Sequence, residues 1–209
     1  VFLPLNTAYQ AAELDYFLGN AEPAVVVCAK RNFPWISKLS FAAGVKNVFT
    51  LDNDRRGTLL DRAVFMSDEH AVVERSADDL AAILYTSGTT GRSKGAMLTH
   101  GNLSSNALTL RTYWGWTDND VLIHALPIFH VHGLFVAIHG ALLAGAKMLW
   151  FEKFEPRAVI AQMARATVMM GVPTLYVRML AEPSLTKQAA QPMRLFIAGS
   201  APLLPETFD

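Results

Sequence analysis

Short apolar runs alternate with amphipathic stretches along most of the chain, so the pattern predicts strands that alternate with helices. From Glu13 to Gly19, the side chains of Leu14, Phe17 and Leu18 share one helical face. The run from Ala24 to Ala29 contains no charged residue and predicts a strand buried on both faces. This alternation is typical of an α/β domain with mostly parallel sheets and helices packed on their faces.

The same pattern continues through the rest of the chain. Further strands are predicted at 47–51, 81–86, 96–99, 121–125, 147–150, 168–171 and 195–198. Helices are predicted at 33–43, 102–113, 134–143, 156–166 and 174–181. The most highly charged part of the chain, 52–79, predicts a connection that runs over the surface.

Composition narrows the class of protein. The 209 residues are 52% hydrophobic and 17% charged, which excludes intrinsic disorder. The 18 basic and 18 acidic side chains balance, so no nucleic-acid partner is expected. Cys28 is the only cysteine and cannot form an internal disulfide, so a reduced cytoplasm is the expected compartment.

One long stretch without formal charge, from Val121 to Ala146, has the length of a membrane span. It contains Pro127 and four histidines, and these groups are costly in lipid unless they face a protein interior. We therefore expect a buried strand, a loop and a buried helix here, and no membrane span.

The strongest chemical signal is a glycine-rich loop from Tyr85 to Gly95 that directly follows a predicted strand. Its glycines let backbone N–H groups approach an anion, while its hydroxyls and Lys94 supply further donors for phosphate oxygens. A flexible surface turn is the alternative. A Walker A loop is disfavoured, because Ser93 precedes the lysine, Gly95 follows it, and strand residues stand where that motif requires a helix.

This loop resembles the phosphate-binding motif of the adenylate-forming (acyl-activating) enzymes, which usually has proline where this chain has Ser93. The segments Phe2–Asn6, Leu126–His130 and Leu195–Pro202 resemble three further motifs of that superfamily, in the same order. By this resemblance, residues 1–209 are an incomplete N-terminal AMP-binding core domain. The first part of that domain and the C-terminal lid domain would be absent, so the fragment alone is expected to be inactive.

The resemblance implies a two-step reaction. A carboxylate joins the α-phosphate of ATP in the presence of Mg²⁺, and the acyl group then passes to coenzyme A. His130 would be the catalytic residue, beside the carboxylate and the α-phosphate, although a lone histidine in an apolar segment is more often a core residue. The residues implied in binding ATP are Thr86, Ser87, Gly88, Thr89, Thr90, Gly91, Lys94, Gly199, Ser200, Ala201 and Pro202.

The acid itself is suggested by Arg178, the single charge between Met170 and Leu180. A buried guanidinium needs an anionic partner. This could be Glu182 one helical turn on, or the second carboxylate of a short dicarboxylic acid. The surrounding motifs most closely resemble malonyl-CoA synthetases, which implies malonate or methylmalonate as substrate, with Arg178, His130 and Ser200 in contact with the acid.

Several alternatives remain open. The chain could come from a medium-chain or aryl acyl-CoA synthetase, from an adenylation domain that loads a carrier protein, or from a nucleotide-binding module without catalysis. The pair His130 and His132 has no accompanying cysteine or acidic cluster, so no structural metal site is predicted. The oligomeric state is not predicted.

Overall fold

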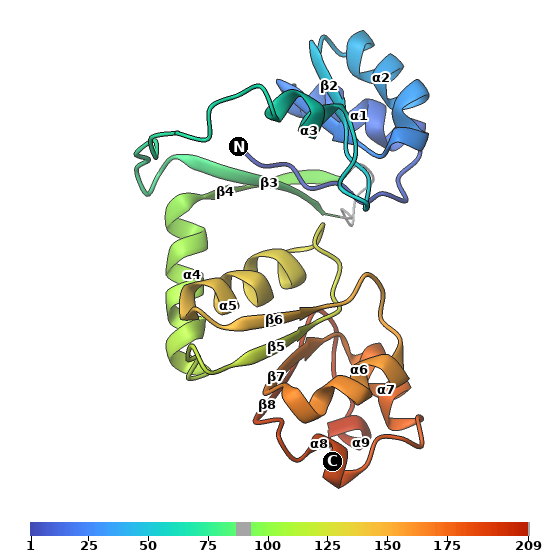
Figure 1. Ribbon diagram of the computed structural model, residues 1–209, viewed down its shortest axis with the longest axis vertical. Helices are drawn as coiled ribbons and strands as arrows, with labels where there is room; N and C mark the ends of the chain where they lie inside the picture. Colours follow the sequence, from blue (N-terminus) through green and yellow to red (C-terminus); the bar gives the residue numbers. More distant parts are fainter. Residues whose placement is uncertain (87–92, 209) are drawn as a thin grey trace. The chain divides into compact units, whose positions relative to one another are not determined.

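The computed structural model describes residues 1–86 and 93–208, which fall into two compact units. Residues 5–74 form one unit, and residues 1–4 together with 75 onward form the other. Mostly parallel strands with helices on their faces confirm the predicted α/β class (Figure 1).

The unit of residues 5–74 is built on two parallel strands, β1 and β2. Its elements are α1 (Ala11–Ala21), β1 (Val25–Cys28), η1 (Lys30–Asn32), α2 (Phe33–Ala42), β2 (Asn47–Thr50) and α3 (Thr58–Ala63). The predicted face of Leu14, Phe17 and Leu18 is buried. However, β1 is not buried on both faces, as the sequence predicted, because Val25 and Val27 are each nearly half exposed on one face of this two-stranded sheet.

The charged stretch 52–79 is largely exposed, as predicted, but it contains the helix α3, which the pattern missed. Two threonines tie the start of this short helix to β2. The backbone N–H of Thr50 donates to the hydroxyl of Thr58 (2.9 Å), and the N–H of Thr58 donates to the hydroxyl of Thr50 (3.0 Å). This tertiary pairing explains a helix that is too short to be stable by itself.

In the second unit, β3 (Leu80–Thr86) and β4 (Lys94–Thr99) form an antiparallel pair in which Thr86 lies opposite Lys94. Helix α4 (His100–Tyr113) follows directly. It begins with a capping box, since the Thr99 hydroxyl accepts from the N–H of Asn102 (3.1 Å) and the Asn102 side chain accepts from the N–H of Thr99 (3.0 Å).

The larger sheet of this unit has four parallel strands in the order β6-β5-β7-β8. The strands are β5 (Val121–His124), β6 (Lys147–Trp150), β7 (Val168–Gly171) and β8 (Leu195–Ala198). The helical segments are η2 (His132–Ile138), α5 (His139–Ala144), α6 (Pro156–Gln162), η3 (Met163–Arg165), α7 (Pro173–Leu180), α8 (Lys187–Ala190) and α9 (Pro205–Phe208). All four strands were predicted to within a residue.

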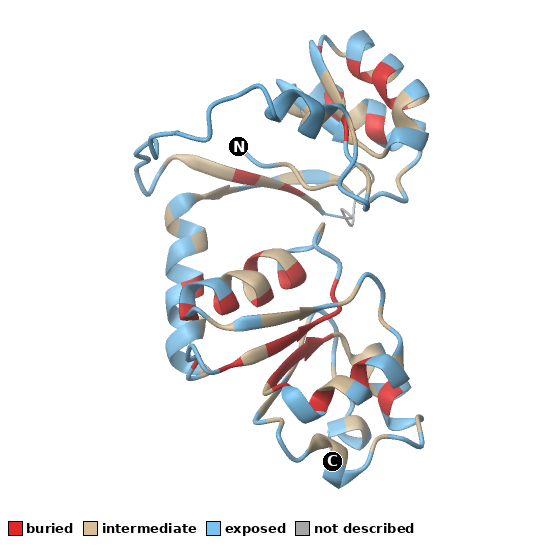
Figure 2. Cartoon of the chain, in the orientation of Figure 1, coloured by how far each residue is buried: buried red, intermediate tan, exposed pale blue. Residues whose placement is uncertain are grey.

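Alternate strand residues face different helices. Leu122 and Val168 pack with Ala137 and Ala141 from η2 and α5 on one face of the sheet. On the other face, residues that include Ile123 pack against α6, η3 and α7. The inner strands β5 and β7 are therefore the most buried part of the unit (Figure 2).

The uncharged stretch that could have spanned a membrane is divided between β5, a loop, η2 and α5, as predicted. Among the described residues, no helix is both long enough and apolar enough to cross a bilayer.

A closed polar network lies at the amino ends of β5, β7 and β8. Arg194 donates to both carboxylate oxygens of Asp120 (2.7 and 2.6 Å), and Thr167 donates to the same carboxylate (2.7 Å). Burial alone would raise the pKa of Asp120, but hydrogen bonds from Arg194, Thr167 and Thr117 lower it to about 2. The guanidinium also donates to the carbonyls of Trp114 and Gly115, so the network fixes the connection that enters β5.

The strand order indicates where a ligand would bind, at the opposite end of the sheet. After β5 the chain adds β6 on one side, and it then crosses to place β7 on the other side of β5. The order of the strands therefore reverses between β5 and β7. In open α/β sheets, ligands bind outside the carboxyl ends of the strands at such a point.

Candidate functional site

The loop that leaves the carboxyl end of β5 carries His130 and ends at the π-helical segment η2. π-Helical segments are rare and occur often at functional sites. The loop folds back tightly on η2, because a Cβ at Gly133 would collide with the carbonyl oxygen of Pro127. Glycine is therefore required at position 133 to hold the loop in place.

His130 is exposed in this loop, so it is not the core histidine of the alternative interpretation. Its ring lies 4.6 Å from the ring of Phe129, and its carbonyl accepts from the N–H of Leu134 (3.0 Å). The backbone is thus fixed, while the exposed imidazole is accessible to a ligand.

His132 joins two of the motifs that the sequence singled out. Its Nδ1 lies 3.1 Å from Oγ of Ser200, a residue 68 positions away at the end of β8. Its ring also lies against Gly199, where a Cβ would come within 3.3 Å of Cε1. The N–H of Gly199 donates to the carbonyl of Gly171 (3.1 Å), so the ends of β7 and β8 meet beside this imidazole.

The turn after β8 has an unusual backbone. Ser200 adopts a φ of 66°, in the left-handed region that L residues avoid. Its neighbours Ala201 and Pro202 are exposed. The four residues Gly199 to Pro202, predicted to lie along the adenine and the acyl group, therefore form an open turn with one hydroxyl fixed by His132.

A second buried imidazole lies beside His132. His124, the last residue of β5, is 1% exposed, and neither ring nitrogen has a hydrogen-bond partner among the described residues. Its ring lies 4.5 Å from that of Trp150. Burial and the neighbouring His132 lower the pKa of His124 to about 4, and burial also lowers the pKa of His132. Both imidazoles are therefore neutral at pH 7.

Tyr176 braces the same end of the sheet. Its hydroxyl donates to the carbonyl of Ile197 (2.7 Å) and lies 3.3 Å from that of Met169. Burial raises the pKa of this phenol. The hydroxyl thereby ties helix α7 to the ends of β7 and β8.

Arg178, two residues further along α7, is exposed, which corrects the expectation of a buried guanidinium. The alternative pairing with Glu182 is also wrong, because Glu182 binds Arg157 of α6 through two contacts of 3.1 Å. Instead, the Arg178 guanidinium lies 4.9 Å from the ring centroid of Phe154. This stacking orients the cation, and no acceptor among the described residues is bonded to its N–H groups.

The phosphate loop is partly described. Thr86 and Lys94 face each other at the end of the β3–β4 pair where the chain passes from one strand to the other, and the Thr86 hydroxyl donates to the Lys94 carbonyl (3.4 Å). Ser87, Gly88, Thr89, Thr90 and Gly91 lie outside the described residues. Lys94 opens a strand rather than a helix, which confirms that the loop is not a Walker A motif.

Strand β3 and the histidine segment belong to one cluster. Ala82 and Leu84 of β3 pack with Phe135 and Leu134 of η2. The strand that leads into the phosphate loop is therefore anchored on the helical segment that begins at His132.

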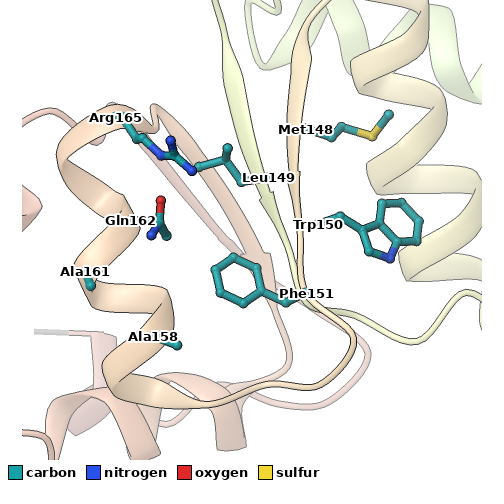
Figure 3. Close-up of a pocket in the computed structure, with 8 residues that line it drawn as sticks. All are labelled: Met148, Leu149, Trp150, Phe151, Ala158, Ala161, Gln162 and Arg165. Carbon is teal, nitrogen blue, oxygen red and sulfur yellow. The ribbon is translucent and has the colours of Figure 1, made fainter. Parts of the chain in front are cut away.

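A hollow in this unit lies away from the predicted site. It has a volume of about 370 Å³ and lies between β6 and α6. Leu149 and Phe151 project from β6 towards α6, whereas Met148 and Trp150 project from the opposite face of the strand (Figure 3). It shares no residue with the predicted site. Among the described residues, no group of three or more metal-binding side chains is arranged to hold a metal ion.

The sequence predicted roles for His130 and Ser200, considered His132 only as a possible metal ligand, and assigned no role to His124 or Tyr176, which the structure places at the same end of the sheet. One signal was present, since His124, His130 and His132 are three of the polar side chains in a stretch without formal charge. The contact between His132 and Ser200 could not be inferred from it.

Comparisons with known proteins identify the family of the chain. The whole chain, residues 1–209, matches the family described as AMP-binding enzyme. The ATP-bound crystal structure of MatB from Rhodopseudomonas palustris is 57% identical with a TM-score of 0.96, covering 99% of this chain and 41% of MatB. A malonyl-CoA ligase solved as a ternary product complex with methylmalonyl-CoA and AMP is 32% identical with a TM-score of 0.77, covering 98% of this chain and 42% of that one.

Among proteins of known sequence, the mitochondrial malonate–CoA ligase of Homo sapiens is 30% identical over 97% of this chain and 37% of its own length. The chain thus spans about two fifths of the length of these relatives.

Proposed function

The chain belongs to the family of AMP-binding enzymes, and on that premise we propose that the protein carrying it is an ATP-dependent carboxylate–CoA ligase. The acid is malonate or methylmalonate, and the reaction passes through an acyl-adenylate. The observation that carries this proposal is the similarity to the malonyl-CoA ligase whose structure holds methylmalonyl-CoA and AMP, which extends over 98% of this chain. The 57% identity to MatB, whose structure holds ATP, supports the nucleotide.

In the first half-reaction a carboxylate oxygen attacks the α-phosphorus of ATP. A C–O–P linkage forms, the bond between the α- and β-phosphates breaks, and pyrophosphate leaves. Both reactants are anions, so positioning and neutralisation of charge supply most of the catalysis. Thr86 and Lys94 lie opposite each other where the chain passes from β3 to β4, which suits them to hold the β- and γ-phosphates of the Mg²⁺-bound nucleotide together with the residues between them.

His130 is the residue proposed to stand beside the reacting carboxylate and the α-phosphate. It is exposed at the carboxyl end of β5, and its backbone is fixed by η2. Gly199, Ser200, Ala201 and Pro202 are proposed to line the adenine and the acyl group. Their open turn at the end of β8 is joined to the histidine loop through the contact between His132 and Ser200.

In the second half-reaction the sulfur of coenzyme A attacks the acyl carbon. A thioester bond forms, the bond from that carbon to the AMP oxygen breaks, and AMP leaves, while the thiol proton passes to the medium. The AMP and methylmalonyl-CoA held together by the related ligase support this order of events.

Arg178 is proposed to select the dicarboxylic acid. Its exposed guanidinium retains free donors while Phe154 holds it in place, so it can form a bidentate pair with the distal carboxylate. A monocarboxylic acid has no second carboxylate to pair with this cation. The residue therefore raises specificity for malonate and does not contribute to nucleotide binding.

The test uses the intact protein that carries this chain and measures acid-dependent release of pyrophosphate with malonate, methylmalonate, octanoate and benzoate. Wild type should favour the two dicarboxylates. Arg178→Leu should lower kcat/KM for malonate by about 100-fold, because a charged, bidentate contact is lost. Its KM for ATP should stay within about twofold of wild type, since no nucleotide contact is removed.

Two variants act as controls. Arg178→Lys keeps the positive charge but cannot form the bidentate pair. Its kcat/KM for malonate should lie between the values for wild type and Arg178→Leu. Arg111→Leu removes an exposed arginine of α4 and should leave malonate kinetics unchanged. A wild-type preference for octanoate or benzoate would reject the dicarboxylate assignment, as would unchanged malonate kinetics in Arg178→Leu.

A further inference from the structure

We propose that His132 is a positioning residue that orients the Ser200 hydroxyl so that it donates a hydrogen bond to a carboxylate oxygen of the acid substrate. The inference rests on the proposed function, but it concerns a carboxylate that any acid substrate would carry. The observation behind it is the direct contact of 3.1 Å between Nδ1 of His132 and Oγ of Ser200.

The serine is held firmly and in an unusual place. Its backbone is left-handed, with a φ of 66°, and the preceding Gly199 is so close to the imidazole that a Cβ would lie 3.3 Å from Cε1. A strained backbone persists only where the surrounding contacts determine it. The imidazole of His132 supplies such a contact, since it meets both the hydroxyl of residue 200 and the backbone of residue 199.

The direction of the hydrogen bond decides what the serine can do. If Nδ1 of His132 carries the proton, it donates to Oγ, and the hydroxyl proton of Ser200 is free to point outward. If Oγ donates to Nδ1, the serine presents only lone pairs to an approaching anion, which repel it. A site for a carboxylate therefore requires the tautomer of His132 with the proton on Nδ1.

The surroundings keep His132 uncharged, so that a choice between tautomers exists at all. The ring is buried, and the titratable group that faces it is His124, which is itself buried with both nitrogens unpartnered among the described residues. No carboxylate is among the groups that shift the pKa of His132. A neutral imidazole can hold the serine in one orientation without competing as a cation for the anionic substrate.

The experiment compares three variants of the intact protein, with whichever acid the wild type activates best. His132→Leu should raise KM for that acid by about tenfold or more, because a hydrogen bond to a charged group is lost or misdirected. KM for ATP should change by less than about twofold. His132→Asn places an amide N–H near the position of Nδ1 and should restore KM for the acid to within about threefold of wild type.

The decisive measurement is a double-mutant cycle with Ser200→Ala. If His132 acts through the serine, then His132→Leu should raise KM for the acid by no more than about twofold in the Ser200→Ala background. Independent effects of the two substitutions, or failure of His132→Asn to restore KM, would overturn the proposal. A loss of kcat and of stability with no change in KM for the acid would also overturn it, because that result describes a purely structural histidine.

A readout without substrate separates this inference from the proposed function. The ¹⁵N NMR chemical shifts of His132 in the intact protein should show a protonated Nδ1 and an unprotonated Nε2 at pH 7. The opposite tautomer would reject the inference even if malonate is the substrate. Conversely, the expected tautomer together with the double-mutant result for another acid would uphold it while the malonate assignment failed.

Discussion

The two ends of the four-stranded parallel sheet differ in how completely their polar side chains are hydrogen-bonded. At the amino ends, Asp120, Thr167 and Arg194 form a network in which the carboxylate accepts from both partners at 2.6–2.7 Å. At the carboxyl ends, the buried ring of His124 has no hydrogen-bond partner among the described residues, and Ser200 has a left-handed backbone. The two kinds of end lie close together in the sequence, since Asp120 immediately precedes β5 and His124 is the last residue of that strand.

This difference indicates that the amino ends of the strands contribute to stability and the carboxyl ends to ligand binding. An ion pair whose carboxylate is buried and has its hydrogen-bonding positions filled stabilises the fold and offers no unfilled position to a ligand. A buried imidazole with no hydrogen-bond partner among the described residues and a strained turn reduce stability, and such features persist where a function requires them. The carboxyl ends also coincide with the reversal of strand order between β5 and β7, where ligands bind in such sheets.

Removing the carboxylate at the amino end tests the stabilising half of the comparison. Asp120→Ala is expected to lower the free energy of unfolding by about 4 kcal/mol, because it removes a buried carboxylate that accepts hydrogen bonds from Arg194, Thr167 and Thr117. Urea unfolding of the intact protein measures the loss, and hydrogen exchange of the amides in β5, β7 and β8 locates it.

Two further variants keep this test interpretable. Asp120→Asn retains an acceptor but loses the charge, so it should lose about 2 kcal/mol and remain folded. Asp118→Ala removes an exposed carboxylate two residues earlier and should change stability by less than about 0.5 kcal/mol. Equal losses of unfolding free energy for Asp120→Ala and Asp118→Ala would mean that the Asp120 network does not stabilise the sheet.

At the carboxyl end the corresponding test is pH. His124 is neutral when folded, with a pKa of about 4, whereas an unfolded histidine has a pKa near 6.5. The unfolded chain therefore binds more protons between these values, so His124 costs stability as the pH falls from about 6.5 to about 4. Relative to His124→Phe, the wild-type protein should lose about 3 kcal/mol by pH 4.

The measurement is the difference in unfolding free energy between the two proteins from pH 7.5 to pH 4. Phenylalanine keeps an aromatic ring beside Trp150, so the packing changes little while the titratable group is removed. His100→Phe, at the exposed start of α4, controls for the added aromatic ring. A difference that does not vary with pH would show that the imidazole of His124 is solvated or paired.

Local sequence patterns predicted most of the fold but not the long-range contacts that hold its elements together. The strands of the four-stranded sheet are short apolar runs, so their positions were predicted to within a residue. Helix α3 was missed because the reciprocal hydrogen bonds between Thr50 and Thr58 hold it, and no local periodicity indicates them. The outer face of β1 was predicted as buried, because an apolar run does not show how many neighbours a strand has.

The candidate site divides in the same way. Motif resemblance located His130 and the turn at Ser200, because each lies within a few consecutive residues. The contact that joins them through His132 spans 68 positions, so only the fold reveals it. The exposure of Arg178 was also unpredictable, since it depends on how α7 packs against α6 and on Glu182 binding Arg157 instead.

The smallest effect separates the strained backbone of Ser200 from its hydroxyl. Ser200→Gly and Ser200→Ala both remove the hydrogen bond to His132, so both should raise KM for the acid substrate equally. Only glycine accepts a φ of 66° without a Cβ penalty, so Ser200→Gly should be more stable than Ser200→Ala by about 1 kcal/mol. Paired urea unfolding curves and acid-dependent pyrophosphate release measure both quantities on the same preparations.

Equal stabilities of Ser200→Gly and Ser200→Ala would show that the turn relaxes once the hydroxyl is gone, which would make the contact with His132 the cause of the left-handed backbone. A KM that rises in Ser200→Ala but not in Ser200→Gly would instead assign the effect to backbone strain and remove the hydroxyl from substrate binding.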